Sequence, residues 1–196
     1  MLLVITALAL VASVPLAGGR LGRLAYVRPK AIWAVLVALA IQVAITTAAP
    51  GGSHSLHAML HVASYVLDAY FVFANRKLAG MLVVALGAAL NVLAIAVNRG
   101  VMPASAAALR ISGVDPRAGF DNSAALAHAH LAFLGDVIPV PGPWPIANVL
   151  SVGDLIIFLG ALVVLHVACG SHLSRLRPWR RAARISPDAR GSTAGI

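Results

Sequence analysis

The stretch Ser151-Val-Gly-Asp-Leu-Ile-Ile-Phe-Leu-Gly-Ala-Leu-Val-Val-Leu-His-Val-Ala-Cys169 decides the class of fold. It contains one acidic residue, Asp154, near its start, and no Lys or Arg. A helix needs about 20 mainly apolar residues to cross the hydrocarbon core of a bilayer. This stretch has that length and that composition, so it predicts a membrane-spanning helix.

Other apolar stretches precede it in the chain. They lie near residues 1–18, 31–49, 58–74 and 78–97. Together with 151–169 they predict an all-α fold, an integral membrane bundle of about five transmembrane helices. The first stretch lacks a basic segment before it, and Arg20 and Arg23 follow it. We therefore interpret it as an uncleaved span rather than a signal peptide.

The composition of the whole chain also indicates a membrane protein. Of the 196 residues, 60% are hydrophobic and 11% are charged, and the mean hydropathy is +0.90. A soluble domain carries about 25% charged residues. This composition excludes a soluble enzyme, a disordered chain and a disulfide scaffold. The lone Cys169 has no partner in the chain, and we interpret it as a small buried residue.

Basic residues predict the orientation of the spans. One side carries Arg20, Arg23, Arg28, Lys30, Arg76, Lys77, Arg175, Arg177, Arg180, Arg181, Arg184 and Arg190, and the other carries Arg99, Arg110 and Arg117. Basic loops stay in the cytoplasm, so the N-terminus is expected outside and the C-terminus inside. Residues 1–170 then form the membrane domain, with a long outer loop at 98–150.

The tail at 171–196 is predicted to be a basic cytoplasmic segment without fixed structure. Its Arg residues would attract anionic lipid. Nucleic-acid binding is not expected, because Trp179 is the only aromatic residue among the charges and a nucleic-acid groove needs several. The expected partners are therefore the lipid bilayer and another membrane protein.

The outer loop carries signals of ordered structure. Ser105 can cap a short helix that Gly113 would end. The segment 121–123 can start a second helix that ends at Gly135. Alternating prolines between 139 and 145 favour a stiff polyproline strut that leads into the last span. The apolar content of the loop favours packing on the bundle or on the bilayer surface.

The third predicted span contains an ionisable residue, Asp68, which by default is a functional candidate inside a membrane. His54, His57, His61 and Tyr65 precede it at helical spacing and would share its face if the helix extends back to His54. The three histidines could present imidazoles to a metal ion. The alternatives are histidines at the wet interface and an Asp68 paired with a neighbouring helix, since the spacing matches no recognised zinc motif.

Two further acidic residues lie on the outer side. Asp154 stands where a carboxylate can cap a helix N-terminus. Asp136 lies among apolar residues in the loop. If these two carboxylates meet, they can share a proton and activate water. Within the fourth span, Asn91 is expected to hydrogen-bond across helices.

Three blocks of sequence resemble a known family. They are Asn98-Arg-Gly100-Val-Met102-Pro103-Ala-Ser105, then Phe133-Leu-Gly135-Asp136-Val-Ile-Pro139, then Ser151-Val-Gly153-Asp154. They resemble blocks of a bacterial multi-spanning membrane family known as domain of unknown function 5317. The resemblance covers nearly all of the chain except the tail. It implies a protein of the bacterial plasma membrane with no established activity.

The last span also resembles that of signal peptidase II. The residues that carry this resemblance are Trp144-Pro-Ile-Ala-Asn148, Asp154 and Gly160. The step from Asn148 to Asp154 is longer than in that enzyme, and its Gly-Asn-x-x-Asp-Arg block is absent here. The resemblance implies hydrolysis by aspartates at the outer leaflet. It gives the second aspartate no matching position in this chain, and Asp136 could take that place only by geometry.

These observations define the expected function and site. The leading hypothesis is a non-enzymatic accessory protein that binds lipid or a partner's transmembrane helix, without a cofactor. The alternatives are an outer-leaflet aspartyl hydrolase using Asp136 and Asp154, and a small transporter or metal-binding protein. The candidate binding residues are Asn98, Met102, Pro103, Asn148, Ser151 and Asp68, and the candidate metal ligands are His54, His57 and His61.

Overall fold

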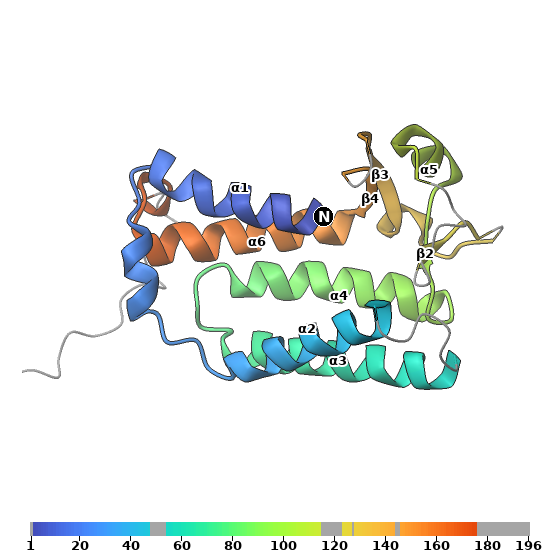
Figure 1. Ribbon diagram of the computed structural model, residues 1–196, viewed down its shortest axis with the longest axis horizontal. Helices are drawn as coiled ribbons and strands as arrows, with labels where there is room; N and C mark the ends of the chain where they lie inside the picture. Colours follow the sequence, from blue (N-terminus) through green and yellow to red (C-terminus); the bar gives the residue numbers. More distant parts are fainter. Residues whose placement is uncertain (1, 48–53, 115–122, 127, 144–145, 176–196) are drawn as a thin grey trace, which may run out of the picture.

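The computed structural model describes residues 2–47, 54–114, 123–126, 128–143 and 146–175. Its long helices lie roughly side by side along the long axis of the molecule (Figure 1). They are α1 (Leu2–Leu16), α2 (Ile32–Thr47), α3 (His54–Ala74), α4 (Met81–Val97) and α6 (Val152–Cys169). The predicted helical class is therefore confirmed for the bulk of the described chain. The predicted tail beyond residue 175 lies outside the described residues.

The helix ends follow local chemistry. α4 begins after Gly80, whose φ of 91° is a left-handed backbone that glycine adopts without strain. α6 ends at Gly170, which has a φ of 64° and forms a left-handed C-cap. α3 begins at His54, earlier than the predicted span, so the helix does extend back to the first histidine.

Consecutive long helices run in opposite directions. Asn75 at the end of α3 bonds to Lys30 just before α2, so these two helices are antiparallel. Gly87 of α4 lies against Gly153 of α6, and this pair is also antiparallel. α1 and α6 end side by side, because the Arg20 N–H donates to the Cys169 carbonyl at 3.0 Å. This Cys169 is buried, as predicted.

Glycines let α4 and α6 approach closely. A Cβ added at Gly87 would lie 2.5 Å from the Gly153 carbonyl oxygen. A Cβ added at Gly80 would lie 2.6 Å from the Gly160 carbonyl oxygen. The two contacts are two helical turns apart on each helix, so the pair is held at short range along much of its length.

Short elements form a cap at one end of the bundle. They are β1 (Met102–Pro103), α5 (Ala106–Ser112), β2 (Ser123–Ala124), the 3₁₀ turn η2 (Ala132–Leu134), β3 (Asp136–Val140) and β4 (Asn148–Ser151). We call the described residues between 102 and 151 the cap. β1 pairs with β2 in parallel, and β3 pairs with β4 antiparallel. The fold is therefore mostly helical and not all-α.

The cap confirms one prediction and corrects two. α5 has Ser105 as its N-cap and Gly113 as its C-cap, as predicted. The helix predicted between 121 and Gly135 is wrong over its described residues, where the chain forms β2 and then η2. The polyproline strut predicted between 139 and 145 is wrong at Pro139 and Val140, which belong to β3 and pair with Val149 and Asn148 of β4. A strand accepts Pro139 at an edge position, and its Val and Ile neighbours favour extended backbone.

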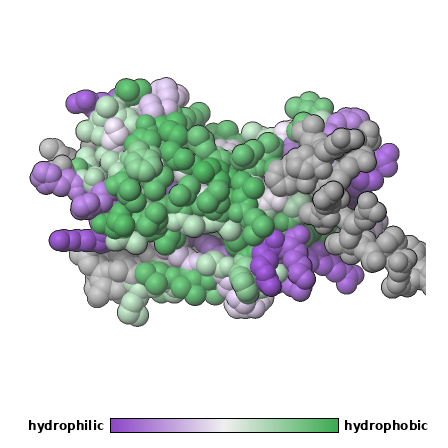
Figure 2. Space-filling model, turned by 180° about the vertical axis from the view of Figure 1, so that it is seen from behind, coloured by the Kyte–Doolittle hydropathy of each residue, from purple (hydrophilic) through white to green (hydrophobic). Residues whose placement is uncertain are grey.

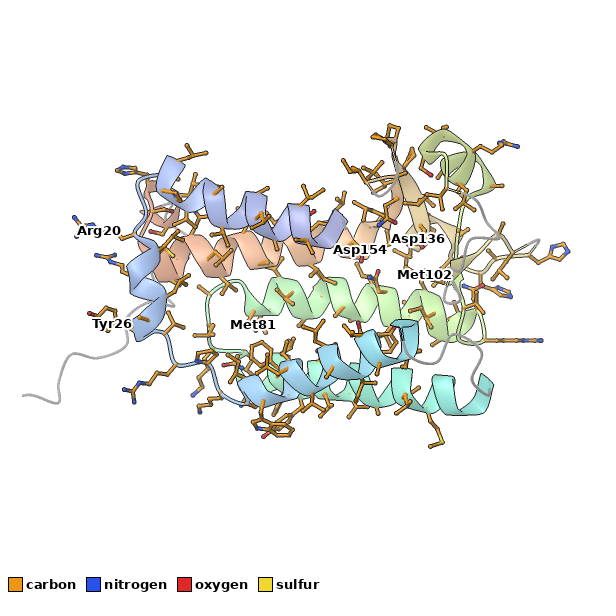
Figure 3. All side chains as sticks on the ribbon, viewed as in Figure 1. Arg20, Tyr26, Met81, Met102, Asp136 and Asp154 are labelled. Atoms are coloured by element: carbon orange, nitrogen blue, oxygen red, sulfur yellow. The ribbon has the colours of Figure 1, made fainter. Side chains whose placement is uncertain are left out.

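The opposite end is basic. It carries the 3₁₀ turn η1 (Leu21–Tyr26), the link from α3 to α4 and the 3₁₀ turn η3 (His172–Arg175). We call it the basic end, after the side chains of Arg20, Arg23, Arg28, Lys30, Arg76 and Lys77. Figure 3 labels Arg20 and Tyr26 there, and Asp136 and Asp154 toward the cap.

Helix length supports a membrane span most directly for α6. Among the described residues, Val152–Cys169 is the one helix long and apolar enough to cross a bilayer, with a mean hydropathy of 2.4. Shorter apolar helices cover Val4–Leu16, Ile32–Ile45, Val62–Ala74 and Met81–Val97. One such helix is weak evidence for a membrane protein, so the count of five spans stays a prediction.

Candidate functional site

A polar network lies where the cap joins the helices, at the start of α6. Ser151 is completely buried and caps the helix. The Asp154 N–H donates to Ser151 Oγ at 3.0 Å, and the Ser151 N–H donates to Asp154 Oδ2 at 3.0 Å. This reciprocal capping box satisfies backbone donors that a helix start leaves without partners. The interpretation of Asp154 as a helix cap is therefore confirmed.

Asn91 of α4 closes the network across the helix pair. Its Nδ2 donates to Asp154 Oδ1 at 2.8 Å, and its Oδ1 accepts from Ser151 Oγ at 2.9 Å. Both carboxylate oxygens of Asp154 thus accept a hydrogen bond. The predicted interhelical role of Asn91 is confirmed, and the network joins α4, α6 and the end of β4.

Asp136 begins the strand that faces this network. Its backbone pairs in register with Ser151, and its carbonyl accepts from the Ser105 N–H at 2.9 Å. The side chain is half-buried. The structure thus brings the two candidate catalytic residues, Asp136 and Asp154, onto adjacent elements (Figure 3). Whether they act together stays a prediction.

Asn98, a candidate binding residue, pins the cap to α4. Its side chain is buried. Nδ2 donates to the carbonyls of Ala94 at 2.7 Å and His130 at 2.8 Å, and Oδ1 accepts from the His130 N–H at 2.8 Å. These bonds satisfy backbone groups of a distant loop, so the observed contacts of Asn98 are structural.

The neighbouring candidates Met102 and Pro103 are also buried in the cap. Met102 packs with Ala94 and Leu134 in an apolar cluster. The Pro103 carbonyl lies so close to Gly135 that a side chain there would collide with it. The contact with Pro103 explains why position 135 is a glycine, and the packing of Met102 on Ala94 fixes the cap against α4.

Asn148 starts β4 at the cap. Its Oδ1 accepts from the adjacent Val149 N–H at 2.8 Å, and its backbone pairs with Val140. These contacts order the start of the strand. The predicted binding role of Asn148 stays a prediction.

Asp68 lies apart from the cap network, in the half of α3 that is nearer the basic end. It is half-buried, and its carboxylate makes no hydrogen bond or ion pair with the described residues. The backbones of His54, His57 and His61 lie in α3, but their side chains are outside the described part. Among the side chains described, no group of three His, Cys, Asp or Glu could hold a metal ion. The predicted metal site therefore stays a prediction.

Sequence reasoning missed a second polar network, at the basic end. His166 of α6 is buried, with its Nε2 3.0 Å from Ser13 Oγ and its Nδ1 2.8 Å from Ser171 Oγ. The Ser13 hydroxyl donates to the Leu10 carbonyl, so it accepts from Nε2, and Ser171 then donates to Nδ1. Two polar residues within predicted apolar spans, Ser13 and His166, were the sequence features that could have indicated this network.

Fold and site together define a mostly helical protein with a small strand-containing cap, held by buried polar networks at both ends. The chain belongs to the family of unknown function DUF5317, which matches residues 27–166. The resemblance expected from the three sequence blocks is thereby confirmed.

An uncharacterized protein of Thermotoga maritima is 34% identical over 100 residues. The match covers 51% of this chain and 58% of that relative, so it spans little more than half of each protein. No solved structure matches the chain. The comparisons therefore establish the family and leave the activity to be inferred from the site.

Proposed function

We propose that the chain is a five-span protein of the bacterial plasma membrane that binds membrane components and does not catalyse a reaction. Every long helix exposes large apolar side chains, including Leu8, Leu36, Val66, Leu82 and Leu159. Figure 2 shows hydrophobic residues over most of the middle of the molecule and hydrophilic residues toward its ends. Apolar surface on this scale is unfavourable in water, whereas acyl chains cover it in a bilayer.

The two ends support the proposed orientation. The segments that carry the six Lys and Arg residues named for the basic end lie at the end of the helices opposite the cap (Figure 1). Basic loops stay in the cytoplasm, which leaves the cap outside. The alternating directions of the long helices are those that five consecutive spans require.

The hydrogen bonding of the Asp154 carboxylate favours a binding function of the protein over a catalytic one. Both of its oxygens accept hydrogen bonds, and they belong to a closed network with Asn91 and Ser151. A carboxylate held in this way stabilises the junction of the cap with the two glycine-packed helices. We take this network as the anchor that presents the cap at the outer surface.

Cysteine labelling of intact cells tests the location and the orientation. In a Cys169→Ser background, Ile111→Cys on the cap should react with a membrane-impermeant maleimide. Lys77→Cys at the basic end should react only after permeabilisation. Labelling in the reverse order, or recovery of the chain in the soluble fraction, would overturn the proposal.

Hydrolysis at the outer leaflet is the second candidate. It is favoured by the β3–β4 register, which sets Asp136 opposite Ser151, and by the resemblance to signal peptidase II. The purified chain should then cleave a lipid-modified peptide, and Asp136→Asn and Asp154→Asn should each abolish cleavage. Asp154→Asn turns an amide N–H2 toward the Asn91 or Ser151 donor, so its melting temperature should fall. Asp136→Asn is therefore the decisive variant, and its loss of activity with an unchanged melting temperature supports the role. Equal background cleavage by all three proteins rejects it.

A further inference from the structure

Asn75 joins two basic segments at the basic end. Its Nδ2 donates to the Lys30 carbonyl and its Oδ1 accepts from the Lys30 N–H, both at 2.8 Å. The same Nδ2 donates to the Phe71 carbonyl at 2.8 Å, and the side chain is buried. The segment that enters α2 is therefore fixed beside the segment that leaves α3.

This clamp brings together cations that form no ion pair with any acidic residue in the described part of the chain. Arg28 and Lys30 lie on the first segment and Arg76 and Lys77 on the second, and all four side chains are exposed. Asp68 is the only acidic residue among the first 114, and it lies more than one helical turn before the end of α3 at Ala74. We call these four residues the cation cluster.

Aromatic side chains lie beside the cation cluster. The rings of Trp33 in α2 and Tyr70 in α3 are 6.1 Å apart, and both are about half exposed. The Arg76 guanidinium lies 4.2 Å from the centre of the exposed Phe73 ring. It also donates to the Phe73 carbonyl at 2.9 Å. Amphipathic aromatic rings concentrate at the membrane–water interface, which puts the cations at headgroup level.

Aliphatic residues continue the same faces into the helices. Leu36 and Val37 lie one turn beyond Trp33, and Val66 lies one turn before Tyr70, all of them exposed. Along the α2–α3 pair the surface thus changes from cationic to aromatic to aliphatic. A phospholipid presents its phosphate, glycerol region and acyl chains in the same order.

We propose that this end of the α2–α3 pair is a binding site for an anionic phospholipid of the cytoplasmic leaflet. The phosphodiester contacts the cation cluster, and the acyl chains lie along Leu36 and Val66. The inference rests on the proposed membrane location. The Asn75 clamp sets the separation of the two basic segments before the lipid binds, which lowers the entropic cost of binding.

Lipid retention by the full-length protein tests the proposal. The protein in detergent is titrated with phosphatidylglycerol or with phosphatidylcholine of the same acyl chains. Bound lipid is counted by native mass spectrometry, and the melting temperature is followed in parallel. We expect phosphatidylglycerol to remain bound and to raise the melting temperature, with a weaker effect at high salt. Phosphatidylcholine should do neither.

A matched pair of variants locates the site. Lys30→Gln with Arg76→Gln should reduce phosphatidylglycerol retention to the level of phosphatidylcholine. Arg99→Gln with Arg110→Gln removes the same charge from the opposite end and should leave retention unchanged. Equal retention by the two double variants would overturn the proposal.

Free glycerol 3-phosphate separates a lipid site from a soluble-phosphate site. We expect it not to displace phosphatidylglycerol, because it lacks the acyl chains. Displacement at equal concentration would overturn the lipid assignment in favour of a soluble phosphate ester. The labelling experiment on intact cells measures the membrane location independently of lipid binding. A failure of lipid binding can therefore be distinguished from a failure of the proposed function.

Discussion

At the scale of single residues, Asn91 links α4 to both Asp154 and Ser151 at the cap junction. Asn91→Ala removes the partners of Asp154 Oδ1 and Ser151 Oγ together. Losing partners for buried polar groups costs about 1–3 kcal/mol, so the free energy of unfolding should fall by that order. Thermal unfolding in detergent measures the change, with the exposed neighbour Val92→Ala as control. Equal effects of the two substitutions would contradict the role of the network.

His166 makes a second prediction at this scale. Because Ser13 donates to the Leu10 carbonyl, we expect the neutral imidazole to carry its proton on Nε2 and to accept at Nδ1. Nitrogen chemical shifts of labelled histidine should report this tautomer. Ser13→Ala should remove the preference for it and weaken the contact of α1 with α6, whereas Ser174→Ala nearby should leave the ring unchanged. A proton on Nδ1 in the unmodified protein would contradict the hydrogen-bond assignment.

At the scale of elements, the α4–α6 pair depends on its glycines. Gly87→Ala puts a methyl group 2.5 Å from the Gly153 carbonyl oxygen, so the helices must separate. Overpacking of this kind costs about 1–3 kcal/mol, and the melting temperature should fall accordingly. Gly22→Ala is the control, since a methyl group there meets nothing within 4 Å. A Gly87 variant as stable as the Gly22 variant would show that the helices do not need this close approach.

The elements that sequence predicts best are those with local signals. Ser105 and Gly113 bound α5 because each acts on its own helix end. The second predicted helix was wrong because β2 depends on pairing with β1, some twenty residues away, as Met102 opposite Ser123 illustrates. Asp136 was recognised as unusual from its apolar neighbours. Its register with Ser151 depends on the pairing of β3 with β4, whereas the alternating prolines favour a polyproline strut.

At the scale of the whole molecule, apolar stretches and basic loops predict the helices and their proposed orientation. They do not predict the long-range hydrogen bonds that join separate segments at the two ends of the bundle. The bond between Ser13 and His166 spans 153 positions, and that between Lys30 and Asn75 spans 45. No local pattern specifies such partners. They form only once the helices are assembled, so the Asn75 clamp and the His166 network were not predicted from the sequence.

Two buried asparagines, at opposite ends of the molecule, each hold a distant segment by hydrogen bonds to its backbone. Asn75 binds the backbone of Lys30 at the basic end, and Asn98 binds the backbone of His130 in the cap. Asn98→Ala should loosen the cap while the basic end stays intact, and Asn75→Ala should do the reverse. Limited proteolysis of right-side-out and inside-out vesicles measures the two ends separately. Each variant should be cleaved faster from one side only, the Asn98 variant from outside and the Asn75 variant from inside. The same pattern in both variants would mean that the ends unfold together and that neither asparagine acts as a local clamp.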